Sequence, residues 1–129
     1  MSTESSSEHH LFVYGTLRSE GSNAWRMKEA RWLASGSTPG MLYRVDWYPA
    51  ARFDASASTR IVGELYVASP DLLRRLDIFE GAEYERVEII VDTDLGPKQA
   101  FAWSYLPSVE SLKPLSHGDW MKEMSPSAP

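Results

Sequence analysis

Residues 69–81 carry both a helix start and a helix stop, and they limit what this chain can fold into. Ser69 is a favourable N-cap, Pro70 suits the first helical position, and Asp71 places an acid in the first turn. Gly81 is a common helix terminator. The other well-marked patterns are short apolar runs typical of strands. A chain with one clearly bounded helix among several strands is expected to be an α+β domain.

The expected strands cover residues 11–14, 41–45, 50–53, 61–67, 84–92 and 98–106. Residues 93–97 form a predicted hairpin loop, so the last two strands are expected to be antiparallel. Asn23 is a candidate N-cap for a weaker helix over residues 24–33, and residues 34–40 are predicted to be a turn. These elements predict a small mixed or antiparallel, barrel-like sheet with flanking short helices.

The length and composition indicate a single domain. The chain has 129 residues, of which 43% are hydrophobic, enough for one sizeable core. We expect a disordered Ser/Thr/Glu-rich lead-in over residues 1–8, a domain over residues 9–121 and a flexible tail over residues 122–129. Trp120, within Gly118-Asp119-Trp120, is the expected buried anchor that holds the tail to the domain.

Charge and residue usage argue against several functional classes. The formal net charge is -5 and the Lys and Arg residues are scattered, which disfavours a nucleic-acid partner. No apolar run approaches the roughly 18 residues of a membrane span, so no membrane partner is expected. Cys is absent, which excludes a thiolate nucleophile and Cys-ligated zinc and suits a cytoplasmic protein. His9 and His10 are far from His117 in the chain, so no metal site is predicted.

The first apolar run, residues 11–14, ends at a glycine. Gly15 lets the backbone turn sharply, so the main-chain N–H groups of Gly15, Thr16 and Leu17 can face a ligand. Such amides can bind a carboxylate or a developing oxyanion. A plain strand–turn junction is the structural alternative.

Glu80 lies on the apolar side of the predicted helix, whose packing stripe is Leu72, Leu73, Leu76 and Phe79. Asp77 lies at the edge of that stripe. Burial and the helix C-terminus would both raise the pKa of Glu80, as a general base working near neutral pH requires. Two alternatives stay open. Glu80 can be a frayed end residue in solvent, or Arg86 can neutralise Glu80 or Asp77 and lower the pKa of the acid.

These two features together resemble the gamma-glutamylcyclotransferase-like family. The resemblance rests on Tyr14-Gly15-Thr16-Leu17 and on residues 76–81 with Tyr84 and Arg86. Residues 63–66, 103–105 and 118–120 support it, and it spans roughly residues 11 to 121. Within the family, the chain looks like the short branch that includes gamma-glutamylamine cyclotransferases and uncharacterised bacterial proteins. The resemblance implies a small mixed barrel, no metal, no cofactor and a small-molecule gamma-glutamyl substrate.

The resemblance also implies the chemistry, which releases 5-oxoproline and a free amine from a gamma-glutamyl amine or peptide. Glu80 would act as base and then acid, and the amides of residues 15–17 would bind the glutamyl group. Tyr14 and Tyr105 would wall the pocket, and Arg18 is a candidate partner for a substrate carboxylate. A non-catalytic binding module for a gamma-glutamyl ligand and an amidohydrolase are the alternatives. The leaving amine would sit at a pocket mouth shaped by loops such as residues 19–23 and 46–49. The particular substrate and the oligomeric state stay open.

Overall fold

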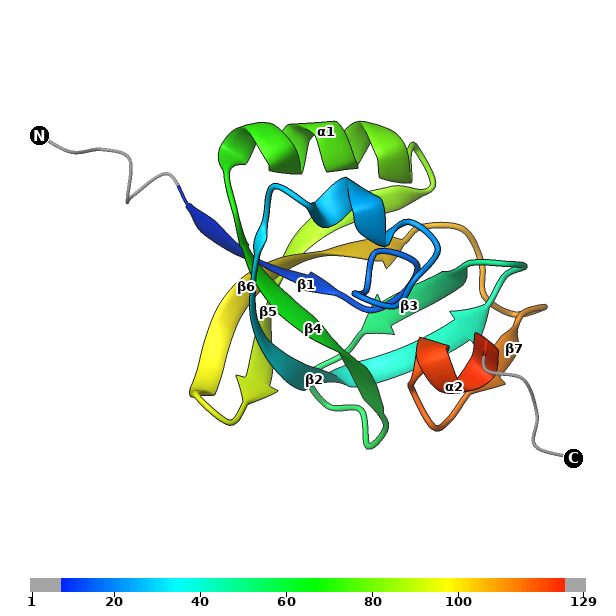
Figure 1. Cartoon of the computed structure of the whole chain (residues 1–129). Coiled ribbons are helices and arrows are strands. Elements are labelled where there is room, and N and C mark those ends of the chain that lie inside the picture. Colours follow the sequence, from blue (N-terminus) through cyan, green and yellow to red (C-terminus); the bar gives the residue numbers. More distant parts are fainter. Residues whose placement is uncertain (1–7, 125–129) are drawn as a thin grey trace, which may run out of the picture.

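The structure is a computed structural model that describes residues 8–124, and its main feature is a sheet of seven strands (Figure 1). The elements in chain order are β1 (His9–Val13), η2 (Ala24–Met27, a 3-10 turn), β2 (Arg31–Arg44), β3 (Pro49–Phe53), β4 (Arg60–Ala68), α1 (Pro70–Glu80), β5 (Tyr84–Thr93), β6 (Gly96–Tyr105), β7 (Lys113–Leu115) and α2 (Trp120–Met124).

The sheet closes on itself as a barrel. Its strands follow the order β2–β4–β1–β6–β5, and β5 returns to β2 where Thr93 and Asp92 pair with Gly36 and Ser37. The β1–β6 pair is parallel, whereas the other pairs are antiparallel. A Cβ atom on Gly36 would lie 2.7 Å from Cγ1 of Val91, so the close approach of β2 to β5 requires a glycine there. The predicted α+β fold with a mixed, barrel-like sheet is confirmed.

The two faces of β1 belong to two hydrophobic clusters. Phe12 and Tyr14 point into the barrel interior, where they pack with Leu42, Leu65 and other buried residues. Leu11 and Val13 point outward, toward the Leu72, Leu73 and Leu76 face of α1. Alternate side chains of a strand face opposite sides of its sheet, so one short strand supplies both clusters. Figure 1 shows α1 lying across one side of the sheet and α2 beside β7 at the other.

The helix predicted over residues 24–33 and the turn predicted over residues 34–40 are wrong. Only Ala24–Met27 forms a 3-10 turn, and the chain is a strand from Arg31 to Arg44. β2 pairs with β4 from Arg31 to Pro39, and its second half pairs with β3 and β7. These long-range pairings override the local helix and turn patterns.

The chain after Leu106 contains two short elements that the sequence patterns do not predict, β7 and α2. The predicted anchor Trp120 is 1% exposed and belongs to the barrel core. α2 runs to Met124, past the predicted domain end at residue 121. Residues 1–7 and 125–129, where the lead-in and most of the tail are predicted, lie outside the described residues. None of the described helices is long and apolar enough to cross a membrane.

Candidate active site

The position of α1 brings Glu80 to the end of β1. The last residue of β4, Ala68, pairs with His9 at the start of β1, so α1 begins beside that end of the strand. Its 11 residues extend about 16 Å, which matches the length of a strand of five residues such as β1. Figure 1 shows α1 running from its junction with β4 toward the loop that follows β1. The C-terminus of α1 therefore meets the Gly15 loop.

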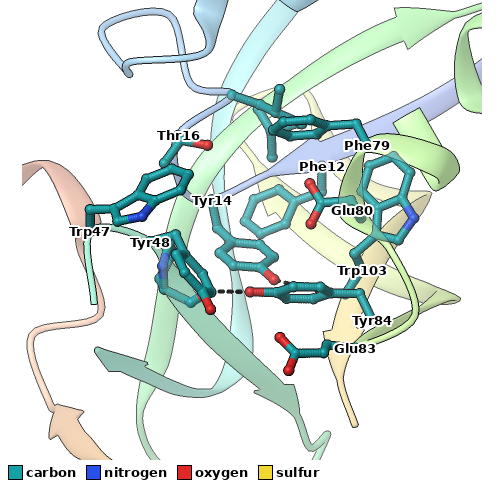
Figure 2. A pocket seen from close by; sticks show the side chains of 14 residues that line it. Phe12, Tyr14, Thr16, Trp47, Tyr48, Phe79, Glu80, Glu83, Tyr84 and Trp103 are labelled. Carbon is teal, nitrogen blue, oxygen red and sulfur yellow. Dashed lines mark hydrogen bonds between the residues drawn. The ribbon is translucent and has the colours of Figure 1, made fainter. Parts of the chain in front are cut away.

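A cavity of about 220 Å³ lies where these elements meet. Figure 2 shows the carboxylate of Glu80 within this cavity, beside Phe12 and Trp103. The lining comes from the end of β1 and its loop, the residues before and at the start of β3, the C-terminus of α1 with the residues after it, and β6. These residues are Phe12, Val13, Tyr14, Gly15, Thr16, Leu17, Trp47, Tyr48, Pro49, Phe79, Glu80, Glu83, Tyr84 and Trp103.

The loop after β1 offers unused backbone donors. The Arg18 amide donates to the Gly15 carbonyl at 3.0 Å, and the Asn23 amide donates to the Thr16 carbonyl at 2.8 Å. Among the hydrogen bonds of the described residues, none is donated by the amides of residues 15–17. A Cβ atom on Gly15 would lie 2.6 Å from Cγ of Pro49, so a larger residue would push the loop and β3 apart. The three residues whose amides are predicted to bind a ligand thus line the same cavity as Glu80.

Glu80 is held in an environment that disfavours its charge. Its side chain is partly buried and has no ion pair or side-chain hydrogen bond among residues 8–124. Burial, and then the negative charge of Asp77 three residues earlier, raise the pKa of Glu80 to about 7. The carboxyl group therefore exchanges a proton near neutral pH.

Arg86 pairs with Asp77 and not with Glu80, so the alternative in which Arg86 neutralises Glu80 is wrong. The Arg86 guanidinium pairs with Asp77 at 3.4 Å, and the indole N–H of Trp103 donates to the other oxygen of Asp77 at 2.8 Å. Asp77 is thus oriented by two partners from β5 and β6. Its charge stays close enough to Glu80 to raise the pKa of that residue.

Two tyrosines beside Glu80, the buried Tyr14 and the partly buried Tyr84, are fixed by their hydroxyl groups. The Tyr14 hydroxyl donates to the Trp103 carbonyl at 2.7 Å, and the Tyr84 hydroxyl donates to the Pro49 carbonyl at 2.7 Å. Burial first, and then the charge of Glu80, raise the pKa of both phenols. They therefore remain protonated and keep the walls of the cavity in place (Figure 2).

The structure brings Glu80 and residues 14–17 together but leaves two predicted site residues outside the lining. Arg18 pairs with Glu64 at 3.3 Å and with Asp119 at 2.8 Å. Tyr105 stacks edge-to-face on Tyr84, with 5.3 Å between the ring centroids. The substrate-binding roles of Arg18 and Tyr105 stay predictions.

Sequence reasoning missed most of the aromatic wall. The signals available were the place of Tyr84 after the Glu80 motif and that of Trp103 in the supporting motif over residues 103–105. Trp47 and Tyr48 belong to the loop over residues 46–49, which is expected at the pocket mouth, but no local pattern indicates which of its side chains reach the cavity. Within residues 8–124, no group of three or more His, Asp or Glu side chains is arranged to hold a metal ion.

Comparisons with known proteins identify the family of this chain. A protein-family model described as "Gamma-glutamyl cyclotransferase, AIG2-like" matches residues 11–122. The gamma-glutamylcyclotransferase family protein YtfP of Escherichia coli K12 is 32% identical over 114 residues, which cover 86% of this chain and 95% of the relative. The crystal structure of YkqA from Bacillus subtilis is similar, with a TM-score of 0.78 at 28% identity, over 90% of this chain and 40% of YkqA. An AIG2-like protein from Mus musculus has a TM-score of 0.74 at 24% identity, over 87% of each chain, and shares the fold.

Proposed function

Because this chain belongs to the gamma-glutamyl cyclotransferase, AIG2-like family, we propose that it converts a gamma-glutamyl amide to 5-oxoproline and a free amine. One observation carries the proposal. Glu80, whose pKa is raised to about 7, and three residues with unused backbone amides line the same cavity. This arrangement supplies a proton carrier and an anion-binding loop, which are the two parts that the reaction needs.

The reaction begins at the alpha-ammonium group of the substrate. The Glu80 carboxylate removes a proton, and the freed amine attacks the gamma-carbonyl carbon to form the ring C–N bond. The resulting oxyanion collapses, the bond to the leaving nitrogen breaks, and protonated Glu80 returns its proton to that nitrogen. Glu80 then takes the second proton from the ring nitrogen and passes it to the released amine, which becomes an ammonium ion, so atoms and charge balance without water or a redox partner.

The amides of Gly15, Thr16 and Leu17 bind either the alpha-carboxylate of the glutamyl group or the oxyanion. The surrounding aromatic rings hold the glutamyl chain in a curled conformation. Since attacking and attacked atoms belong to one molecule, this restriction supplies much of the acceleration.

A panel of gamma-glutamyl amides, gamma-glutamyl dipeptides and glutathione tests the reaction. We expect release of 5-oxoproline, measured by liquid chromatography with mass detection, and an equal amount of free amine. Free glutamate in place of 5-oxoproline would identify an amidohydrolase. Binding of these compounds without turnover would identify a non-catalytic binding module.

Replacing the proposed base tests the mechanism. We expect Glu80→Gln to lower kcat by about 10²-fold or more, because Gln cannot carry the proton. The control is Glu85→Gln, the same chemical change at an exposed position of β5 outside the cavity lining. If Glu80→Gln turned over as fast as Glu85→Gln, the mechanism would be wrong.

A further inference from the structure

The cavity has an unbalanced set of charges. Its lining contains two carboxylates, Glu80 and Glu83, and no Lys, Arg or His side chain. Arginines close to the site are engaged elsewhere. Arg86 pairs with Asp77, and Arg26 stacks on Phe79 and Trp25 at 4.1 and 4.3 Å while bonding Asn23. A ligand in this cavity therefore meets negative side chains, and the anion-binding groups it can use are the backbone amides of residues 15–17.

The Glu83 side chain has no bonding partner among the described residues. It is exposed, and among residues 8–124 its carboxylate has no ion pair and no hydrogen bond. Figure 2 places this carboxylate at one edge of the cavity, beside the ring of Tyr84. An unpaired carboxylate at a cavity edge attracts positively charged groups and repels negatively charged ones.

Aromatic rings complete the same rim. Trp47 is 54% exposed although its ring lines the cavity, and it packs edge-to-face on Tyr48 with 5.0 Å between centroids. The faces of Trp and Tyr rings attract cations electrostatically, and Trp does so most strongly. An exposed Trp and an unpaired carboxylate that line one cavity are thus suited to an organic cation.

We propose that the rim formed by Glu83, Trp47 and Tyr48 binds the amine half of the substrate and selects leaving amines that carry a positive charge. This inference rests on the proposed function. The loop amides are the anion-binding groups for the glutamyl half, either for its carboxylate or for the oxyanion, and a second carboxylate on the leaving half would find no cation in the lining. Gamma-glutamyl diamines are therefore preferred substrates, and gamma-glutamyl peptides that end in a carboxylate are poor ones.

Three substrates that differ in one terminal group test the charge preference. They are the gamma-glutamyl derivatives of pentylamine, 1,5-diaminopentane and 5-aminopentanoate, which end in a methyl, an ammonium and a carboxylate group. We expect kcat/KM, measured by 5-oxoproline release, to be highest for the ammonium compound and lowest for the carboxylate compound. Each step should be about two- to five-fold, as for partly exposed charge pairs, and should shrink with added salt. Equal kcat/KM values for the three compounds would overturn the proposal.

Matched variants assign the preference to the rim. Glu83→Gln should lower the ratio of kcat/KM between the ammonium and carboxylate compounds by about three-fold or more, and Trp47→Leu should lower it by about two-fold. Glu85→Gln removes the same charge two residues away, outside the cavity lining, and should keep the wild-type ratio. A ratio that Glu83→Gln and Glu85→Gln change equally would assign the preference to net charge and overturn the role of the rim.

The proposed reaction can fail separately from this subsite. If none of the three compounds releases 5-oxoproline, the reaction is wrong, and the same three compounds are then compared by their dissociation constants from calorimetry. Tightest binding of the ammonium compound, lost in Glu83→Gln, would still support the subsite. Binding without that order, or no binding, would overturn it.

Discussion

At the scale of single residues, the site depends on how Glu80 and Asp77 share one helix face. Asp77 accepts a hydrogen bond from the Trp103 indole and forms an ion pair with Arg86. Glu80 has neither kind of partner among residues 8–124. The two carboxylates are therefore inequivalent. Asp77 carries the compensated charge, and burial first, then that charge, raise the pKa of Glu80.

The pH dependence of the reaction should report this coupling. Glu80 must be deprotonated to act as base, so kcat/KM should fall below about pH 7. Asp77→Asn removes a negative charge that raises the pKa of Glu80, so the acid limb should move to lower pH. Asp71→Asn, an exposed change in the first turn of α1, should leave the limb in place. A limb that Asp77→Asn left unmoved would contradict the assigned cause of the shift.

The pH dependence of the free energy of unfolding should show the same raised pKa of Glu80 in the absence of substrate. The folded-state pKa of Glu80 is raised from 4.5 to about 7, so between these values the folded protein holds a proton that the unfolded chain has lost. Folding is then progressively disfavoured as pH rises through this range, by roughly 3 kcal/mol in total.

Glu80→Gln should remove this pH-dependent loss. Measured by urea unfolding, the variant should gain stability relative to wild type at about pH 8 but not at about pH 5, whereas Glu85→Gln should show no such pH-dependent gain. An equal effect of Glu80→Gln at both pH values would mean that Glu80 titrates normally.

At the scale of elements, α1 is the part that carries the acid to the loop. Its start is well defined because the Ser69 hydroxyl accepts a hydrogen bond from the Leu72 amide at 3.1 Å and Pro70 follows as the first helical residue. Its end is closed by the Gly81 amide, which donates to the Asp77 carbonyl at 3.1 Å. The capping pattern in the sequence therefore also sets where Glu80 stands relative to β1.

Removing the N-cap should weaken this element. Ser69→Ala leaves the Leu72 amide without its side-chain acceptor and should lower the free energy of unfolding by about 1 kcal/mol. Ser69→Asp keeps an acceptor at the cap and should stay close to wild type. Urea unfolding at neutral pH measures both variants. Equal stability of Ser69→Ala and Ser69→Asp would show that packing alone holds the helix start.

At the scale of the whole molecule, a buried charge network connects three distant segments. Glu64 of β4 is 7% exposed and accepts bonds from the Arg18 side chain and, at 2.8 Å, from the Ser19 amide. Arg18 also binds Asp119 at 2.8 Å, and the Val62 amide donates to the Gly118 carbonyl at 2.8 Å. The loop after β1, β4 and the segment before α2 are thus held together beside the candidate site.

Breaking this network should destabilise the fold strongly. Arg18→Met leaves the buried Glu64 carboxylate without its ionic partner and should lower the free energy of unfolding by about 3 kcal/mol. Arg74→Met removes an arginine from an exposed pair with Asp71 and should change it by less than about 1 kcal/mol. Urea unfolding separates the two. A small effect of Arg18→Met would show that water, and not burial, surrounds Glu64.

The sequence by itself determined α1 with its bounds, the strands β3 to β6, the glycine-ended β1 and the apolar-side position of Glu80. These features depend on capping groups and on periodicity within a dozen residues, where the interacting atoms are close along the chain. The family resemblance could also be seen in the sequence by itself, because the short motifs stand in the order and at the spacing that the family has.

Only the tertiary structure decided that residues 31–44 form one strand, that Arg86 pairs with Asp77, and that Trp47 and Tyr48 line the cavity. Each of these depends on contacts between segments far apart in the chain. β2 is a strand because β4, β3, β7 and β5 supply its hydrogen-bond partners, and local propensity is too weak to resist them. The cavity likewise exists only once the barrel closes and α1 packs across it.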